Sequence, residues 1–167
     1  MAAITAQQAG SANRIAFLDL LAFSEGTSSE ELTQNDGYDV IVTGVDGGEV
    51  FTDYSDHPFA HRAAKVIRKG PPVLVSTASG RYQLLYRFWT SYKASLKLAD
   101  FSPLSQDLVA LQQIRERNAL TMIDAGDFDL AISQCSSIWA SLPGNSYGQG
   151  GKPMGVLLAK VLELQSA

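Results

Sequence analysis

The chain has 167 residues, of which 46% are hydrophobic and 18% charged, and its formal net charge at pH 7 is −4. This composition predicts a folded globular protein and excludes a disordered one. The acidic balance argues against a general nucleic-acid binder, whose affinity comes largely from Lys and Arg. The one cysteine, Cys135, excludes an internal disulfide framework.

The first residues carry no sign of export. Residues 1–13 are small and polar, so we expect a flexible N-terminus. They lack the charged segment and apolar core of a secretory signal. No apolar run approaches the roughly 20 residues that span a bilayer. We therefore expect a protein that is made in the cytoplasm and stays soluble there, without stable membrane insertion.

The first half of the chain changes from helical to strand spacing. Apolar residues and Glu25 share one face at helical spacing over residues 14–25, and Gly26 fits the position just past the last turn. Residues 40–42 and 50–54 are rich in β-formers and flank a glycine-containing turn, which predicts a β-hairpin. A short helix is expected over residues 59–69, ended by "GPP".

The second half reads as mainly helical. After a third strand at residues 73–75, we expect helices over residues 82–98, 103–117, 127–139 and 154–164. The predicted class is α+β: a mainly helical lobe with a small β-hairpin or three-stranded sheet lobe at about residues 38–76. One catalytic domain would cover residues 14–167, with a cleft between its lobes.

Glu25 is the candidate for acid chemistry. It ends an apolar helix and lies three and four residues beyond Ala22 and Leu21, so its stem points to their side. Partial desolvation and the negative end of the helix dipole both raise the pKa of a carboxyl group. A raised pKa suits a general acid near neutral pH. On spacing alone, an exposed glutamate at a frayed helix end is the commoner case.

Other reactive residues have plainer explanations. His57 and His61 lie four apart, but Pro58 disfavours a continuous helix and the chain has no third histidine, so we expect no metal site. Cys135, Trp89 and Trp139 lie on apolar helix faces and are expected in the core. We expect no cofactor. The basic residues at 62, 65, 68 and 69 are interpreted as a solvated face.

Six blocks of sequence resemble the endolysin family of bacteriophage lambda and its relatives. In chain order they are "AFLDLLAFSEGT" (16–27), "GYDVIV" (37–42), "FTDYSDHP" (51–58), "GRYQLL" (80–85), "FSPLSQDLVALQQIRER" (101–117) and "CSSIWASLPGNSYGQ" (135–149). The resemblance implies a lysozyme-like fold and a lytic transglycosylase that cleaves peptidoglycan glycan strands. It departs at the hairpin turn "TGVDGGEV", at residues 59–75 and in the last helix.

The resemblance also assigns site residues. The glutamate of "SEGT" corresponds to Glu25, which would be the proton donor. "GRYQ" resembles the Gly-x-x-Gln element of lysozyme-like transglycosylases, which places Gln83, with neighbouring Tyr82, at the sugar site. "YGQ" points to Tyr147 and Gly148 as substrate contacts, and "FTDYSDHP" points more weakly to Tyr54. We also expect a monomer. The missing signal, together with the family's habit of using a holin, implies a protein that waits in the host cytoplasm until a holin opens the way to the periplasm and wall.

Two alternatives stay open at this stage. Most glycoside hydrolases need a second carboxylate, whereas a transglycosylase can use the C6 hydroxyl of its own substrate. A hydrolysing muramidase would combine Glu25 with an aspartate, and the candidates are Asp36, Asp39, Asp53 and Asp56. A silent glycan-binding protein on the same scaffold is the alternative from another class.

Overall fold

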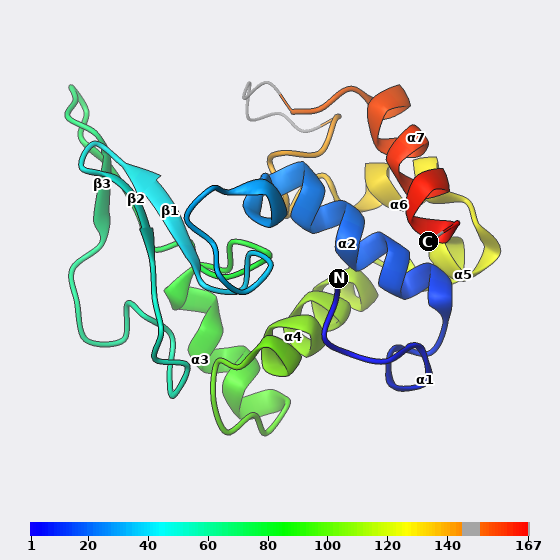
Figure 1. The fold of residues 1–167 in the computed structure, drawn as a ribbon, viewed down its shortest axis with the longest axis horizontal. Coiled ribbons are helices and arrows are strands. Elements are labelled where there is room, and N and C mark those ends of the chain that lie inside the picture. The colour runs from blue at the N-terminus through cyan, green and yellow to red at the C-terminus, as the bar shows by residue number, and fades with distance from the viewer. Residues whose placement is uncertain (145–150, 167) are drawn as a thin grey trace. The chain divides into compact units, whose positions relative to one another are not determined.

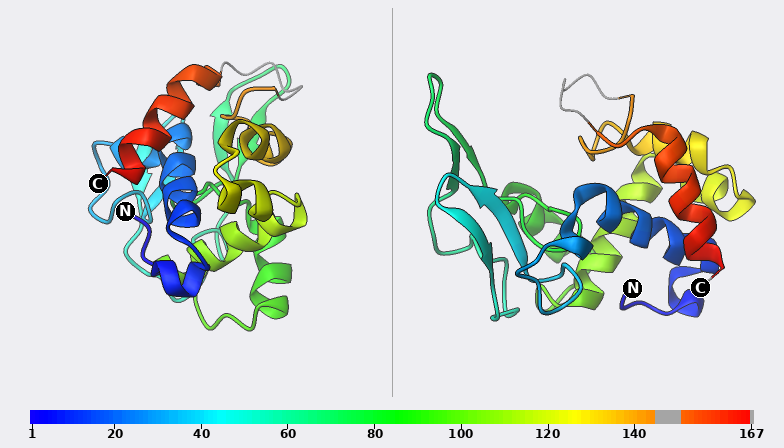
Figure 2. Two further views of the ribbon diagram at one scale, coloured as in Figure 1. Left: turned by 90° about the vertical axis from the view of Figure 1, so that its right-hand side faces the viewer. Right: turned by 45° about the horizontal axis from the view of Figure 1, so that its top comes forward.

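The computed structural model describes residues 1–144 and 151–166. Its contacts divide the chain into two compact units. The helical unit comprises Met1–Glu25 and Asp107–Ala167, and the sheet unit comprises Gly26–Gln106 (Figures 1 and 2). The predicted sheet lobe at residues 38–76 lies within the sheet unit.

The helical unit is built around a long apolar helix. This helix, α2 (Ala12–Glu25), contacts α1 (Ala6–Ala9), α5 (Leu120–Ala125) and α7 (Met154–Gln165), and α7 also contacts α6 (Phe128–Cys135) (Figure 1). Its side chains from position 17 to 22, apart from Asp19, are completely buried. Because α2 is apolar on most of its surface, it forms the core of this unit. Its last residue, Glu25, directly follows this buried segment.

The N-terminal residues contain a helix that the sequence analysis did not expect. Thr5 and Gln8 form a capping box, in which each side chain bonds the backbone of the other. Ile4 is buried, and its N–H donates to the carboxylate of Asp107 at 2.8 Å. These contacts place α1 within the helical unit. The flexibility of residues 1–13 stays a prediction.

The sheet unit contains two antiparallel hairpins. β1 (Val40–Gly44) pairs with β2 (Gly47–Val50), and β3 (Lys65–Arg68) pairs with β4 (Leu74–Ser76). This unit also contains the 3-10 helix η1 (Thr27–Ser29), the helix α3 (Tyr86–Ser95) and the first residues of α4 (Pro103–Glu116). The predicted α+β class and the first hairpin are confirmed.

The helix predicted over residues 59–69 is wrong, because this segment contains β3. Lys65 is buried despite its charge, and its Nζ lies 3.4 Å from Asp46 and 3.1 Å from Glu49, both from the first hairpin. The backbone of β3 pairs with β4, so "GPP" connects two strands instead of ending a helix. Long-range pairing therefore overrides the local sequence signal.

The helices differ from the predictions in α3, α5 and α6. α3 begins at Tyr86 instead of residue 82, because Ser79 and Leu84 pair as an isolated bridge and hold the intervening residues in a turn. α6 ends at Cys135 instead of residue 139, and α5 was not predicted. Cys135 and both tryptophans are buried, as predicted. Burial raises the pKa of the Cys135 thiol to about 12, which fits an unreactive core residue.

An aromatic cluster forms the core of the sheet unit. Phe101 lies 4.8 Å from the ring of His57 and 4.9 Å from the ring of Trp89. His57 Nε2 donates to the carbonyl of Leu84 at 3.0 Å, and its Nδ1 accepts the N–H of Phe59 at 3.2 Å. This pattern fixes a neutral imidazole.

Within residues 1–144 and 151–166, no group of three or more potential ligands could hold a metal ion.

The neutral state of His57 makes the stability of the fold sensitive to acid. Burial lowers the pKa of His57 from its ordinary value of 6.5. His57 therefore binds a proton more readily in the unfolded chain than in the folded protein. Its contribution to the free energy of unfolding is complete above pH 6.5 and is lost progressively as the pH drops below that value. We expect urea denaturation to give a smaller free energy of unfolding at pH 5.5 than at pH 7.5. His57→Gln should flatten this difference, whereas His61→Gln, at an exposed position, should preserve it. An unchanged pH slope in His57→Gln would contradict this assignment.

Candidate active site

Glu25 is the last residue of α2 and its carboxylate is largely withdrawn from water. Its Oε1 accepts a hydrogen bond from Ser141 Oγ at 2.5 Å. Burial raises the pKa of Glu25, while the Ser141 bond and the positive charge of Lys152 act in the opposite direction. The net direction is upward, because desolvation outweighs both. This direction agrees with the raised pKa expected from the sequence, and the role of Glu25 as a general acid stays a prediction.

Two hydrogen bonds to its carbonyl oxygen hold Ser141 in place. Its carbonyl oxygen accepts hydrogen bonds from Ser24 Oγ at 3.1 Å and from the N–H of Lys152 at 3.2 Å. A Cβ on Gly151 would lie 2.4 Å from the same oxygen, so only glycine allows this approach. The sequence analysis did not single out Ser141. The one signal that contains it is the block at residues 135–149.

Two lysines lie over the ring of Phe23, which comes two residues before Glu25 on α2. The Nζ atoms of Lys152 and Lys160 lie 5.0 and 5.4 Å from the ring centre of Phe23. A cation above an aromatic face is attracted by the ring quadrupole, which restrains both side chains. The positive charge of Lys152 lowers the pKa of Glu25, but by less than burial raises it.

The sheet unit contributes the "GRYQ" turn. Gly80 adopts a φ of +77°, and its N–H donates to the carbonyl of Val40 at 2.8 Å. Gln83 has a φ of +52°, and both its N–H and its Nε2 donate to the carbonyl of Gly80, at 3.1 and 3.0 Å. The Gln83 amide is thus held by its own turn, which gives it a defined orientation.

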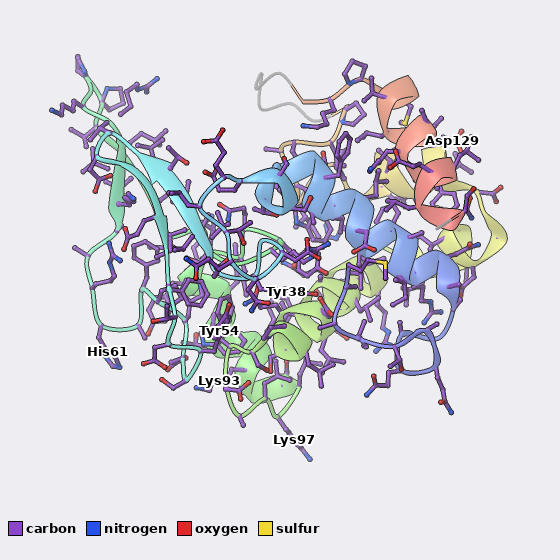
Figure 3. The ribbon with its side chains drawn as sticks, in the orientation of Figure 1. Tyr38, Tyr54, His61, Lys93, Lys97 and Asp129 are labelled. Carbon is purple, nitrogen blue, oxygen red and sulfur yellow. The ribbon has the colours of Figure 1, made fainter. Side chains whose placement is uncertain are left out.

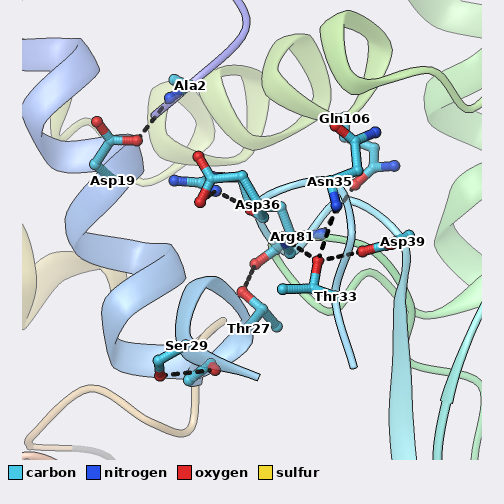
Figure 4. Close-up of polar contacts among 12 residues, drawn as sticks. Ala2, Asp19, Thr27, Ser29, Thr33, Asn35, Asp36, Asp39, Arg81 and Gln106 are labelled. Atoms are coloured by element: carbon cyan, nitrogen blue, oxygen red, sulfur yellow. Dashed lines mark hydrogen bonds and ion pairs between the residues drawn. The ribbon is translucent and has the colours of Figure 1, made fainter. Parts of the chain in front are cut away.

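The buried Arg81 holds the "GRYQ" turn in place through its side chain and its backbone. Its side chain is 2% exposed, and its Nη1 lies 3.0 Å from the carboxylate of Asp36. The Arg81 carbonyl accepts a bond from Thr27 Oγ1 at 2.7 Å, and its N–H donates to Gln106 Oε1 at 2.9 Å (Figure 4). Sequence reasoning missed Arg81 and Gln106, because nothing local marks either residue as buried.

The predicted aromatic contacts differ in exposure. Tyr82 is 4% exposed, and its ring packs edge-on against Tyr38 with centres 6.4 Å apart, so it has little surface to offer a sugar. Tyr54, labelled in Figure 3, is partly exposed. Its hydroxyl accepts a hydrogen bond from Asn35 at 2.7 Å. Tyr147 and Gly148 lie outside the described residues.

All four candidate aspartates have partners within the sheet unit. Asp36 pairs with Arg81, and Asp39 is buried, accepting bonds from Thr33 Oγ1 and the N–H of Gln34. Asp53 accepts the N–H of Ser55. Asp56 accepts bonds from Trp89 Nε1 at 2.6 Å and from the N–H of His57 at 2.9 Å, and it pairs with Lys93 at 3.2 Å. These contacts give the carboxylates of Asp36, Asp39 and Asp56 structural roles, whereas Asp53 is exposed.

The described site residues fall into two groups. Glu25 lies with Ser24, Ser141 and Lys152 in the helical unit. Gln83, Tyr82 and Tyr54 belong to the sheet unit. The helical group can donate and accept a proton. The sheet group can offer amide and hydroxyl contacts to a polar ligand.

Comparison with known proteins identifies close relatives. A family model described as Endolysin matches residues 15–163. The chain is 64% identical over 140 residues to the endolysin of Escherichia phage P2, covering 82% of this chain and 83% of that one. It is 57% identical over 151 residues to the endolysin of Escherichia phage lambda, covering 90% and 89%.

Solved structures give the same result for the fold. A structure of bacteriophage lambda lysozyme complexed with a chitohexasaccharide matches with a TM-score of 0.81 and 55% identity, covering 92% of this chain and 94% of that one. A second structure of the lambda enzyme matches with a TM-score of 0.77. The predicted lysozyme-like fold and the predicted family resemblance are confirmed.

Proposed function

The chain belongs to the endolysin family, whose members include the lambda enzyme, and we propose that it cleaves peptidoglycan by lytic transglycosylation with Glu25 as acid and base. The activity class is that of a glycan-cleaving enzyme used in host cell lysis. The scissile bond would be the β-1,4 bond between N-acetylmuramic acid and N-acetylglucosamine. The observation that carries this proposal is the partly desolvated Glu25 carboxyl group, held by Ser141.

The reaction needs one carboxyl group that changes role. Protonated Glu25 gives its proton to the glycosidic oxygen as the bond from the muramic C1 breaks, through an oxocarbenium-like transition state. The C6 hydroxyl of the same muramic acid then attacks C1 and gives its proton to the ionised Glu25. The products are a 1,6-anhydro-muramic end and a free 4-hydroxyl group. Water, metal and cofactor take no part in this balance.

Substrate binding is proposed for the residues assigned by the family resemblance. Gln83 has the best support in the described residues, because its own turn orients its amide. Tyr54, Tyr147 and Gly148 are proposed as further contacts. The burial of Tyr82 favours a supporting role beneath the turn. The lambda enzyme complexed with a chitohexasaccharide supports a glycan strand as the partner of this site.

The structural contacts of the aspartates weigh against a hydrolysing muramidase. A base that activates water needs a carboxylate oriented to water, whereas those of Asp36, Asp39 and Asp56 are held by other side chains or buried backbone groups. Asp53 is exposed and accepts the N–H of Ser55. The hydrogen bonds from Ser55 lower the pKa of Asp53. Burial raises the pKa of Asp56, but the hydrogen bonds from Trp89 and His57 and the charge of Lys93 together outweigh it, so the net direction is downward. A silent glycan-binding protein has no need of a desolvated acid.

Access to the wall is the remaining part of the proposal. None of the helices in the described residues is both long and apolar enough to cross a bilayer. By the resemblance to the lambda family, we propose that the protein acts as a monomer. It would remain in the host cytoplasm until a holin opens the inner membrane.

Mass spectrometry of muropeptides, released from purified peptidoglycan by this protein, tests the proposed reaction. We expect anhydro-muramic ends, whose mass is lower than that of reducing ends by one water. Reducing ends alone would establish hydrolysis and would overturn the proposed transglycosylation. Glycan that binds the protein but is not cut would support the silent binding protein. A Glu25→Gln sample controls for contaminating wall enzymes.

A further inference from the structure

Two serine hydroxyls form a chain that ends on the Glu25 carboxyl group. Ser24 Oγ donates toward Ser141, lying 3.1 Å from its carbonyl oxygen and 3.0 Å from its Oγ. Ser141 Oγ in turn donates to Glu25 Oε1 at 2.5 Å. Ser24 and Glu25 are adjacent at the end of α2, whereas Ser141 comes from 116 residues further along the chain. All three residues belong to the helical unit.

The direction of donation along these hydrogen bonds follows from the number of hydrogens that each hydroxyl can donate. A serine hydroxyl has one hydrogen to donate, and a carbonyl oxygen can only accept. The hydrogen of Ser24 therefore points to Ser141, where the carbonyl and the hydroxyl oxygen both lie within reach. The hydrogen of Ser141 is then free to point along the short contact to Oε1 of Glu25.

We propose that Ser141 is a positioning residue whose hydroxyl, directed by Ser24, occupies Oε1 of Glu25 and reserves Oε2 as the oxygen that carries the catalytic proton. This inference rests on the proposed function of Glu25. An oxygen that already accepts a short hydrogen bond is a poor place for the proton, so the proton resides on the other oxygen. Oε2 then gives the proton to the glycosidic oxygen and later takes the proton of the C6 hydroxyl. One carboxyl orientation serves both steps.

The opposite arrangement makes an opposite prediction. If protonated Glu25 donated to Ser141 Oγ, that bond would stabilise the protonated carboxyl group. Removal of the hydroxyl would then lower the pKa of Glu25. If Ser141 donates to Glu25, as proposed, its bond stabilises the ionised form, and removal raises the pKa. The sign of the change therefore separates the two arrangements.

The experiment is a ¹³C NMR titration of the Glu25 carboxyl group in the full-length wild type, Ser141→Ala, Ser141→Thr and Ser24→Ala. We expect Ser141→Ala to raise the pKa of Glu25 and Ser141→Thr to restore it. Ser24→Ala should move it in the same direction as Ser141→Ala, but less. Ser136→Ala removes a partly buried hydroxyl that bonds the carbonyl of Ser133, and it serves as the control. A fall or no change in Ser141→Ala would overturn the proposal.

Kinetics on a soluble glycan supply the functional measurement. Because Ser141→Ala removes a hydrogen bond to a charged group, we expect it to lower kcat by roughly tenfold to a hundredfold. KM should change little, because Ser141 is not proposed to touch the glycan. The upper limit of the pH profile of kcat/KM should move upward with the pKa of Glu25. Since NMR titration needs no turnover, it tests the Ser141 arrangement even if the reaction were hydrolysis.

Discussion

Glu25→Gln should abolish glycan cleavage while the protein stays folded. Glutamine has nearly the size of glutamate, and its Oε1 can still accept the hydrogen of Ser141 Oγ. It has no proton to give to the glycosidic oxygen. General acid catalysis contributes about 10²–10⁴ in rate, and here one group is both acid and base, so we expect a loss of at least about 10³-fold. Turbidity of a wall suspension and release of anhydro-muropeptides measure this loss.

The stability of Glu25→Gln provides a second measurement with a defined sign. Burial raises the pKa of Glu25 above its ordinary value of 4.5. Its contribution to stability is therefore complete below pH 4.5 and is lost as the pH rises through the folded-state pKa. Glutamine does not ionise. We expect the Tm of Glu25→Gln to equal or exceed that of the wild type near pH 7, and the difference to shrink toward pH 4.5.

Glu163→Gln is the matched control, because Glu163 is an exposed carboxylate on α7 that pairs with Lys160. It should keep full activity and a nearly unchanged Tm, since exposed ion pairs contribute little. Residual cleavage by Glu25→Gln at a tenth of the wild-type rate would remove Glu25 from its proposed role.

The setting of Glu25 could be predicted because its signals are local. Helical spacing placed it on the side of Leu21 and Ala22, both of which are completely buried. The resemblance carried by "SEGT" singled it out from other glutamates. Ser141 could not be found in this way. Its contact with Glu25 depends on how the chain after α6 returns to the end of α2, and no local periodicity encodes that return.

The second hairpin shows the same limit for the fold. Residues 59–69 end in "GPP", which is as typical of a helix stop as of a turn between strands. The strand is favoured by ion pairs of the buried Lys65 with Asp46 and Glu49, partly or largely exposed residues that come from another hairpin. The first hairpin was predictable, because both its strands and its turn residues lie within one short segment.

Gly80→Ala should destabilise the protein strongly, because a side chain at this position meets two separate penalties. A φ of +77° costs an alanine about 1–2 kcal/mol. In addition, the new Cβ would lie 2.2 Å from Gln106 Oε1. Gln106 cannot move aside freely, since it is buried and bonds the N–H of Arg81 and the carbonyls of Tyr38 and Phe101. Loss of these buried bonds adds about 2–3 kcal/mol.

The total of about 3–5 kcal/mol corresponds to a fall in Tm of roughly 6–20 °C for a chain of this size. Gly126→Ala is the matched control, because Gly126 has a φ of +86° and nothing within 4 Å of the position of a Cβ. It should lose only the backbone penalty, about 1–2 kcal/mol. In a Gln106→Ala background the cost of Gly80→Ala should fall to the same value, because the clash has been removed. Equal losses for Gly80→Ala and Gly126→Ala in the wild-type background would instead mean that Gln106 yields without cost. The "GRYQ" turn would then owe its position to Arg81 and its ion pair with Asp36.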